Sequence, residues 1–214
     1  STLSEEVRRA AGEAIIVTME TEMQKSGAAA CISVDNTKLG QALAEAAMRG
    51  VPKGGTVLLL DSLPGDNGVT ERLLAAEAAL HNGARQMLRC RRYGEESLSD
   101  ALRAALQQTH PAAVVAMESS ALETAAQVVH QETKAPLVYG TGATSAIAAA
   151  LEQNDLTAIL AQNEFAAGYL AVQAAVCAVR HENSSIPEQM PFFTVRRETM
   201  YTPELEKLLF PVTR

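Results

Sequence analysis

Short apolar runs alternate along the chain with longer segments in which apolar residues recur every three or four positions. The runs at 57–60 and 112–117 are apolar at successive positions, which is typical of strands buried on both faces. The segment that carries Val69, Leu73, Ala76 and Leu80 has the spacing of a helix with one buried side, and Gly83 ends it. The alternation predicts parallel strands covered by helices.

The same patterns give a set of expected elements. Strands are expected at 15–19, 31–34, 57–60, 85–92, 112–117, 137–139, 157–161 and 192–195. Helices are expected at 4–14, 38–49, 69–80, between 98 and 110, around 122–129, at 143–153, at 165–181 and after Thr202. Strands that alternate with helices in this way predict an α/β fold with doubly wound parallel sheets.

Two breaks divide this pattern. Residues 51–55 hold a Pro-Lys-Gly-Gly break, and residues 182–190 form a polar connector. We therefore expect two lobes, each built from two pieces of chain: residues 1–50 with 164–190, and residues 51–163 with 191–214.

Polar side chains follow five of the expected strands. Each could be a helix cap or turn residue, as the capping preferences of Asp, Asn and Thr allow. In one parallel sheet, however, the strands' carboxyl ends share an edge, and ligands of open α/β sheets bind there. The pattern indicates a binding cleft for a polar small molecule. The residues expected to line it, one group after each strand, are Asp35 and Asn36; Asp61, Asp66 and Arg72; Glu118 and Ser119; Thr141 and Thr144; and Gln162, Asn163 and Glu164.

Charge and composition narrow the classes of function. The formal net charge of −7 argues against nucleic acid or an anionic membrane as a main partner. The basic group Arg89, Arg91 and Arg92 alternates with Cys90 and is interpreted as a solvated strand edge. The three cysteines are far apart and are expected to be buried free thiols, and the four histidines lack metal-site spacing. We expect no metal, no cofactor and no membrane span.

A glycine-rich stretch at 140–145 is the strongest competing motif. It follows a strand and opens a helix, as a dinucleotide-binding fingerprint does, but Ser145 stands where the third glycine belongs. A tight turn with a Thr or Ser helix cap is the favoured interpretation. An enzyme on this sheet stays open as a hypothesis, although no nucleophile lies beside a base in a known motif.

The order of several segments resembles the type I periplasmic binding proteins, in particular the ribose-binding-like sugar binders, which are related to the effector domains of LacI-type repressors. The similar segments lie at 34–40 (VDNTKLG), 65–72 (ending TER), 157–168 (TAILAQNEFAAG) and 198–211. The resemblance covers nearly the whole chain. It lacks a counterpart for the family's opening section, so the first lobe is expected to be incomplete.

The resemblance implies roles for individual residues. Asp35, Arg72 and Gln162 match positions that hydrogen-bond ligand hydroxyls, and Tyr93 lies near the place of a stacking aromatic. Two departures affect the expected ligand. Glu118 with Ser119 replaces an Asn-Asp pair, and the family's Gly-x-Asp is Gly140-Thr141-Gly142, so its ligand-binding Asp is absent. Glu118 could supply the lost carboxylate or select a cationic ligand, and Thr141 joins the expected site.

The function that the resemblance implies is reversible binding of a small polar ligand, a sugar first of all, in a cleft between the lobes. The protein would be the solute-binding component of an ABC importer, with the permease as partner and an extracytoplasmic location. The alternative is the ligand-sensing effector domain of a LacI-type transcription regulator, which would be cytoplasmic. No catalysis is implied.

Overall fold

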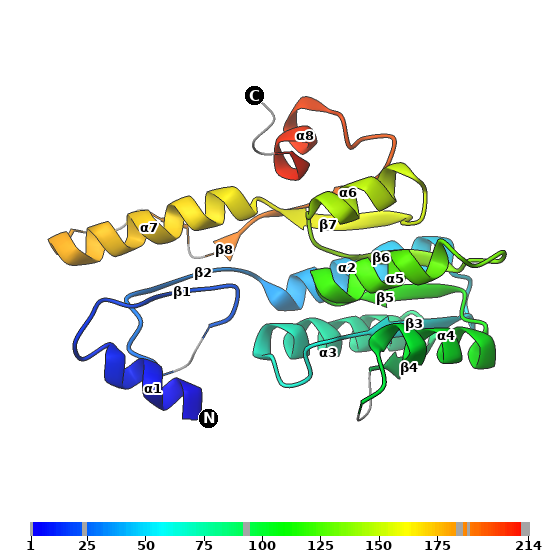
Figure 1. Ribbon diagram of the computed structural model, residues 1–214, viewed down its shortest axis with the longest axis horizontal. Helices are drawn as coiled ribbons and strands as arrows, with labels where there is room; N and C mark the ends of the chain where they lie inside the picture. The colour runs from blue at the N-terminus through cyan, green and yellow to red at the C-terminus, as the bar shows by residue number, and fades with distance from the viewer. Residues whose placement is uncertain (1, 23–24, 92–94, 183–185, 188, 211–214) are drawn as a thin grey trace. The chain divides into compact units, whose positions relative to one another are not determined.

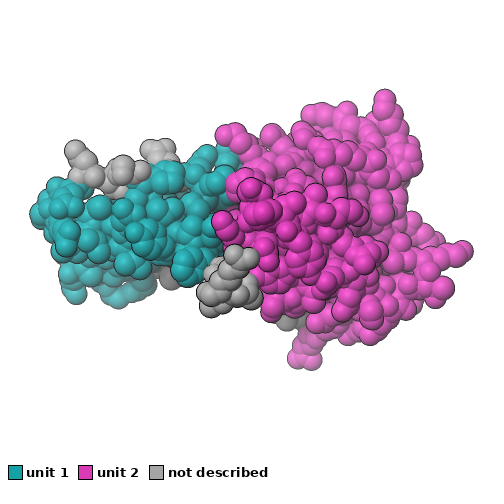
Figure 2. Space-filling model, turned by 90° about the horizontal axis from the view of Figure 1, so that it is seen from above, with its two compact units in different colours: residues 1–35, 163–191 teal, residues 36–162, 192–214 magenta. Residues whose placement is uncertain are grey.

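The computed structural model describes residues 2–22, 25–91, 95–182, 186–187 and 189–210. Their contacts divide the chain into two compact units, residues 1–35 with 163–191 and residues 36–162 with 192–214 (Figure 2). The expected first boundary, between residues 50 and 51, differs from the observed one between Asp35 and Asn36. The reason is that the helix at residues 36–50 packs against the helix at residues 67–82 and against strands of the larger unit.

The larger unit contains a six-stranded sheet with the order β4-β3-β5-β6-β7-β9. Its strands are β3 (Thr56–Leu60), β4 (Gln86–Cys90), β5 (Ala113–Ala116), β6 (Leu137–Thr141), β7 (Ala158–Gln162) and β9 (Phe192–Val195). The pairings are parallel from β4 to β7, and β9 joins β7 antiparallel. The predicted doubly wound α/β fold with parallel sheets is therefore confirmed, with an antiparallel strand added at one edge.

Helices cover both faces of this sheet (Figure 1). On one face lie α2 (Asn36–Gly50) and α3 (Asn67–Asn82), and on the other α4 (Leu98–Thr109), α5 (Ser119–Val129) and α6 (Ser145–Glu152). The short α8 (Pro203–Leu209) follows β9 and has the Pro at its first position that the Thr202-Pro203 pair predicts.

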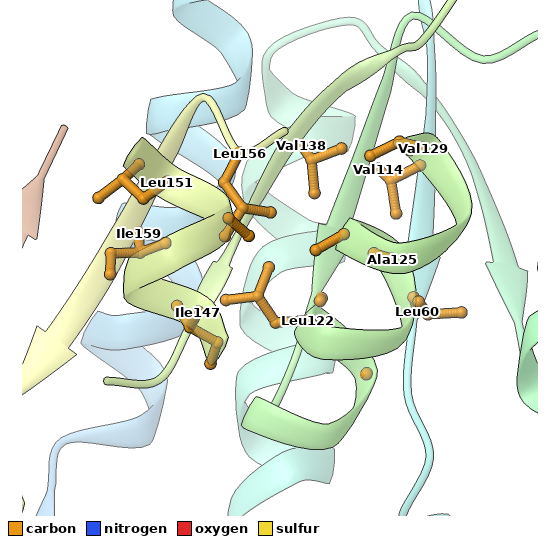
Figure 3. Packing of buried hydrophobic residues seen from close by; sticks show 14 of the residues in the cluster. Leu60, Val114, Leu122, Ala125, Val129, Val138, Ile147, Leu151, Leu156 and Ile159 are labelled. Atoms are coloured by element: carbon orange, nitrogen blue, oxygen red, sulfur yellow. The ribbon is translucent and has the colours of Figure 1, made fainter. Parts of the chain in front are cut away.

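The main core lies between the sheet and the α4–α5–α6 layer. Leu122 and Ala125 of α5 and Ile147 and Leu151 of α6 pack on side chains from successive strands (Figure 3). Strand residues alternate between this core and the α2–α3 side, and β3 and β5 are buried throughout except at the first residue of β3. Burial on both faces explains why these strands are continuous apolar runs.

The smaller unit contains a three-stranded parallel sheet with the order β1-β2-β8. Its elements are α1 (Thr2–Ala10), β1 (Val17–Met19), β2 (Ala30–Val34), α7 (Glu164–Arg180) and β8 (Gln189–Met190). The connector expected at 182–190 thus ends in a short strand. The helix α7 packs on β1 and β2. Among the described residues of this unit, buried apolar side chains are few: Ile32, Val34, Ala167, Ala174 and Met190.

The three cysteines are free, as expected, but only Cys90 is fully buried, and Cys31 and Cys177 are half-buried. Burial at the end of β4, with smaller contributions from the charges of Glu96 and Asp61, raises the pKa of the Cys90 thiol to about 11. The thiol therefore stays protonated at neutral pH and acts as a small apolar side chain.

Candidate functional site

The carboxyl edge of the six-stranded sheet carries several of the polar strand-end residues expected to line a cleft. Leu60, Ala116 and Gly140 are register partners on β3, β5 and β6, so the next residues, Asp61, Met117 and Thr141, follow in one row. Helices α3, α5 and α6 begin just beyond these strands. The parallel arrangement thus collects side chains that are far apart in the sequence.

Asp61 follows β3, the second strand in the sheet order, and is 2% exposed. Its backbone N–H donates to the Cys90 carbonyl, and its Oδ2 lies 3.8 Å from Nη2 of Arg91 on the neighbouring chain segment. Its other oxygen, Oδ1, is buried with no hydrogen-bond partner among the described residues. A buried carboxylate oxygen without a donor costs free energy, so this atom is a candidate acceptor for a ligand hydroxyl or ammonium group.

Glu118 caps α5 with one of its two carboxylate oxygens. Oε1 accepts hydrogen bonds from the Ser62 amide at 2.8 Å, the Ser62 hydroxyl at 2.6 Å and the Ala121 amide at 3.2 Å. Oε2 is buried and, like Asp61 Oδ1, has no partner in the described part of the chain. Burial raises the pKa of Glu118, and the charge of Asp61 raises it further, against the lowering effect of the Ser62 and Ala121 hydrogen bonds.

Arg72 of α3 is buried and ties three elements together. Its Nε donates to Oδ1 of Asn36 at 2.6 Å, and its Nη1 donates to the Met117 carbonyl at 2.7 Å. The guanidinium therefore fixes the start of α2 and the end of β5 relative to α3. Met117, whose carbonyl accepts from Arg72, directly precedes Glu118 in the sequence. The predicted contact of Arg72 with a ligand stays a prediction.

Asp35 and Asn36 divide their tasks differently from expectation. Asn36, one of the residues that could have been a helix cap, is instead the first residue of α2, and its side-chain oxygen accepts from Arg72. Asp35 directly precedes the helix, is half-buried and is the last residue of this piece of the smaller unit. Its predicted hydrogen bonds to ligand hydroxyls stay a prediction.

The remaining predicted site residues fall in three situations. Thr141 is buried, and its hydroxyl donates to the Leu160 carbonyl of β7 at 2.8 Å, so its lone pairs remain available as acceptors. Gln162 ends β7, is half-buried and pairs with Phe192 in the ladder. Tyr93 lies outside the described residues.

The glycine-rich stretch at 140–145 forms a strand end, an irregular link and the start of a helix. Gly140 and Thr141 belong to β6, and Thr144 caps α6 by accepting from the Ile147 amide. Gly142 has φ +143°, a value that L side chains rarely adopt, which explains this glycine. The expected Thr cap is confirmed, whereas residues 142–144 form an irregular link between β6 and α6 and not a tight turn.

The strand-end pattern in the sequence includes Asp61 but gives no sign of Ser62, which donates two hydrogen bonds to Glu118. Asp61 was one of the polar strand ends, but only the structure shows that its Oδ1 lacks a partner. The signal available for Ser62 is its position directly after Asp61 at the end of β3.

Two surface hollows on the larger unit lie away from this edge. One of about 430 Å³ is lined from α4, α5 and α6, and one of about 710 Å³ lies where β5 and β6 begin, beside Pro111 and Pro136. No three His, Cys, Asp or Glu side chains of the described residues gather as a metal site would need. Across the same residues, every helix is too short or too polar to cross a bilayer.

A family model described as periplasmic binding protein domain matches residues 1–183, and the chain belongs to this family. Among solved structures, an ABC transporter solute-binding protein from Agrobacterium vitis bound with α-D-tagatopyranose is similar at a TM-score of 0.87 and 16% identity, over 98% of this chain and 76% of that one. A carbohydrate transporter solute-binding protein from Agrobacterium radiobacter in complex with D-arabinose gives a TM-score of 0.87 at 15% identity, over 97% and 75%.

A putative LacI transcriptional regulator from Bacteroides fragilis is also similar, with a TM-score of 0.83 at 12% identity over 94% of this chain and 73% of that one. No curated protein sequence matched the chain. The chain thus has the type I periplasmic-binding-protein fold and spans about three quarters of the length of these neighbours. The resemblance stated from the sequence motifs is confirmed.

Proposed function

We propose that the protein reversibly binds a small polar ligand, most simply a sugar, as the solute-binding component of an ABC importer outside the cytoplasm. Membership of the periplasmic binding protein family supports a binding role without turnover. The sugars named with the two Agrobacterium neighbours support a hydroxyl-rich ligand. The permease would be the protein partner of the loaded form.

The observation that carries this proposal is the pair of unpartnered oxygens at the sheet edge, Asp61 Oδ1 and Glu118 Oε2. Each can accept a hydrogen bond from a ligand hydroxyl, and a carboxylate acceptor makes that bond stronger than a neutral one. The edge also offers the Thr141 lone pairs and Gln162. Two acidic acceptors beside each other favour ligands rich in donors, so polyhydroxyl or cationic compounds are preferred over anions.

The experiment is a thermal-shift screen with pentoses, hexoses, polyols, amino acids and nucleosides, followed by calorimetric titration of each hit. A ligand at about 100 times its Kd should stabilise the protein by about 2.7 kcal/mol. The recovered ligand should be chemically unchanged, as binding without catalysis requires. A failure of every class to shift the melting temperature would contradict the proposal.

The site is tested with Asp61→Asn and Glu118→Gln, which keep side-chain size but replace an acceptor by a donor. We expect each change to weaken binding about 10- to 100-fold, the cost of losing a hydrogen bond to a charged group. Glu152→Gln is the matched control, because Glu152 is the exposed last residue of α6, the helix end remote from the sheet edge, and accepts from the Tyr201 hydroxyl. Equal affinities for all three variants would remove Asp61 and Glu118 from the site.

Arg72→Ala is a poor sole test, because it removes structural hydrogen bonds as well as any ligand contact. The change leaves the Asn36 side chain and the Met117 carbonyl without their donor. Asn36→Ala therefore serves as the companion variant, because it removes the Arg72–Asn36 hydrogen bond but leaves the guanidinium in place. A ligand role for Arg72 predicts weaker binding in Arg72→Ala than in Asn36→Ala at temperatures where both are folded.

The effector domain of a LacI-type regulator is the second candidate, supported by the similarity to the Bacteroides fragilis protein. It would bind the same kind of ligand, so the ligand screen does not separate the two. The open reading frame does: an export or lipoprotein signal before residue 1 supports transport, and a helix-turn-helix supports regulation.

A further inference from the structure

Glu118 uses its two carboxylate oxygens in different ways. Oε1 accepts from the Ser62 amide at 2.8 Å, from the Ser62 hydroxyl at 2.6 Å and from the Ala121 amide at 3.2 Å. A carboxylate oxygen has two lone pairs, so three donors leave Oε1 no room for another hydrogen. Oε2 is buried and accepts from none of the described residues. An added proton and a ligand hydroxyl therefore both meet Glu118 at Oε2.

The negative charge of Glu118 is poorly compensated. The side chain is 7% exposed, and no ion pair joins it to a cation of the described residues. Burial raises the pKa of Glu118 most, and the charge of Asp61 raises it further, against the lowering effect of the Ser62 and Ala121 hydrogen bonds. Asp61 itself has a cation close by, because Arg91 lies 3.8 Å from its Oδ2. Of the two carboxyl groups, Glu118 is therefore the one that gains most from a proton.

The other charged side chains on the elements around Glu118 have partners of their own. The start of α6 has no titratable side chain, and Tyr139 of β6 has its hydroxyl near Gly50 of α2. The remaining groups and their partners are Arg91 after β4 with Asp61, Arg72 of α3 with Asn36 and the Met117 carbonyl, Asp100 of α4 with Arg103, and Glu123 of α5 with the Thr144 hydroxyl. Protonation is thus the route by which the described part of the protein neutralises Glu118.

We propose that a ligand hydroxyl and a proton compete for Oε2 of Glu118, so that the site exchanges one proton for its ligand and empties in acid. The inference rests on the proposed function, because it concerns the same acceptor. The ionised carboxylate accepts a hydroxyl hydrogen at Oε2, whereas the neutral acid has its own hydrogen there. By linkage, the ligand lowers the proton affinity of Glu118 by the same factor by which the proton lowers the affinity for the ligand.

The competition determines how affinity depends on pH. Below the pKa of Glu118 in the free protein, each unit by which the pH falls should raise the Kd about tenfold, because one proton must leave before the ligand binds. Above that pKa the carboxylate is already ionised, and the Kd should be constant. The onset lies above the ordinary Glu value of 4.5, since the pKa is raised. A receptor outside the cytoplasm would thus lose its ligand as the surrounding medium acidifies.

Calorimetric titration with the neutral pentoses, hexoses and polyols of the ligand screen, between about pH 4 and pH 8, tests the competition. These probes carry no charge across this range, so any change in Kd comes from the protein. Titrations in buffers of different ionisation enthalpy count the protons released. We expect about one proton on the acidic side of the onset and none well above it. Circular dichroism verifies that the protein is folded at each pH.

Two variants separate Glu118 from other titrating groups. Glu118→Gln cannot ionise, so its Kd should not change with pH, and its affinity gap to the wild type should close as the pH falls. Asp61→Asn removes the neighbouring charge and should move the onset to lower pH with an unchanged slope. Glu152→Gln, at the exposed end of α6, is the control and should keep the wild-type profile.

The outcomes distinguish the competition from the function on which it rests. If no probe binds at any pH, the proposed function fails and the competition fails with it. A probe whose Kd does not vary with pH, or that binds more tightly in acid, leaves the proposed function standing and overturns the competition. The competition is also overturned if Glu118→Gln keeps the pH dependence of the wild type.

Discussion

At the scale of single residues, Glu118 combines a cap and a titratable group. Because its raised pKa belongs to an acid, the folded state keeps this proton to higher pH than the unfolded state does. The free energy of unfolding should therefore fall as pH rises from the ordinary Glu value of 4.5 through the raised pKa. The stabilising contribution of protonated Glu118 to the free energy of unfolding is complete below this pH window and lost above it.

Glu118→Gln removes this titration. The free energy of unfolding of the variant minus that of the wild type should increase with pH across the same window, because only the wild type pays for ionising a buried carboxyl. Urea denaturation at a series of pH values measures both. Glu95→Gln, at an exposed position, controls for the loss of a carboxyl as such. Parallel pH profiles for Glu118→Gln and the wild type would contradict the assignment.

Single residues are also where prediction from sequence reached its limit. The strand-end pattern identified Arg72, Glu118 and Thr141 as polar residues at one sheet edge, and the structure puts them there. The pattern could not show that the Asn36 side chain accepts a hydrogen bond from Arg72 instead of capping a helix. That bond joins residues 36 apart in the chain. Which oxygens of Asp61 and Glu118 lack donors depends on exact side-chain geometry, and no periodicity encodes it.

At the scale of elements, the crossing of α2 and α3 depends on Gly40. A Cβ at this position would lie 2.1 Å from the carbonyl oxygen of Arg72. At this crossing the backbone of α2 therefore packs directly on the backbone of α3. Gly40→Ala should destabilise the fold by about 1 to 3 kcal/mol, the usual cost of overpacking, because the obstacle is backbone. Chemical denaturation measures this difference.

Gly168→Ala is the matched helical control for Gly40→Ala. Nothing lies within 4 Å of a Cβ at Gly168, so alanine should stabilise α7 by up to about 1 kcal/mol through its better helix propensity. The two substitutions should change the free energy of unfolding with opposite signs. Equal effects would show that propensity, and not the helix crossing, decides the response at Gly40.

Elements were predicted well where the apolar period was long and regular. The helix expected from Val69 to Leu80 is α3, with Gly83 at its end, and the strand expected at 192–195 is β9. Short elements were harder to predict from the sequence: β8 consists of two residues within a polar connector. Its pairing with β2 is a tertiary effect, since two residues carry no period of their own.

At the scale of the whole molecule, the two units have unequal cores. The α4–α5–α6 side of the larger unit is packed with leucine, isoleucine and valine, whereas the smaller unit buries few apolar side chains. Burial of apolar surface is the main favourable contribution to folding, so the smaller unit should open at a lower free energy cost.

Hydrogen exchange followed by mass spectrometry tests this difference. Peptides from β2 and α7 should exchange through openings that cost less free energy than those of β3, β5 and α5. The physical reason is the shortage of buried side chains that each opening of the smaller unit must expose. Uniform protection across both units would contradict the expectation.

The order of the pieces along the chain also has a consequence for synthesis. The larger unit is interrupted after Gln162 and resumes only at Phe192, so its last strand leaves the ribosome after all of α7. Until β9 arrives, β7 (AILAQ) has no partner on one side, and an apolar strand with a free edge invites pairing with other chains. A nascent chain that stalled before Phe192 would therefore contain five strands of the six-stranded sheet, with the β7 edge unpaired. Such chains should aggregate through this edge unless a chaperone covers it.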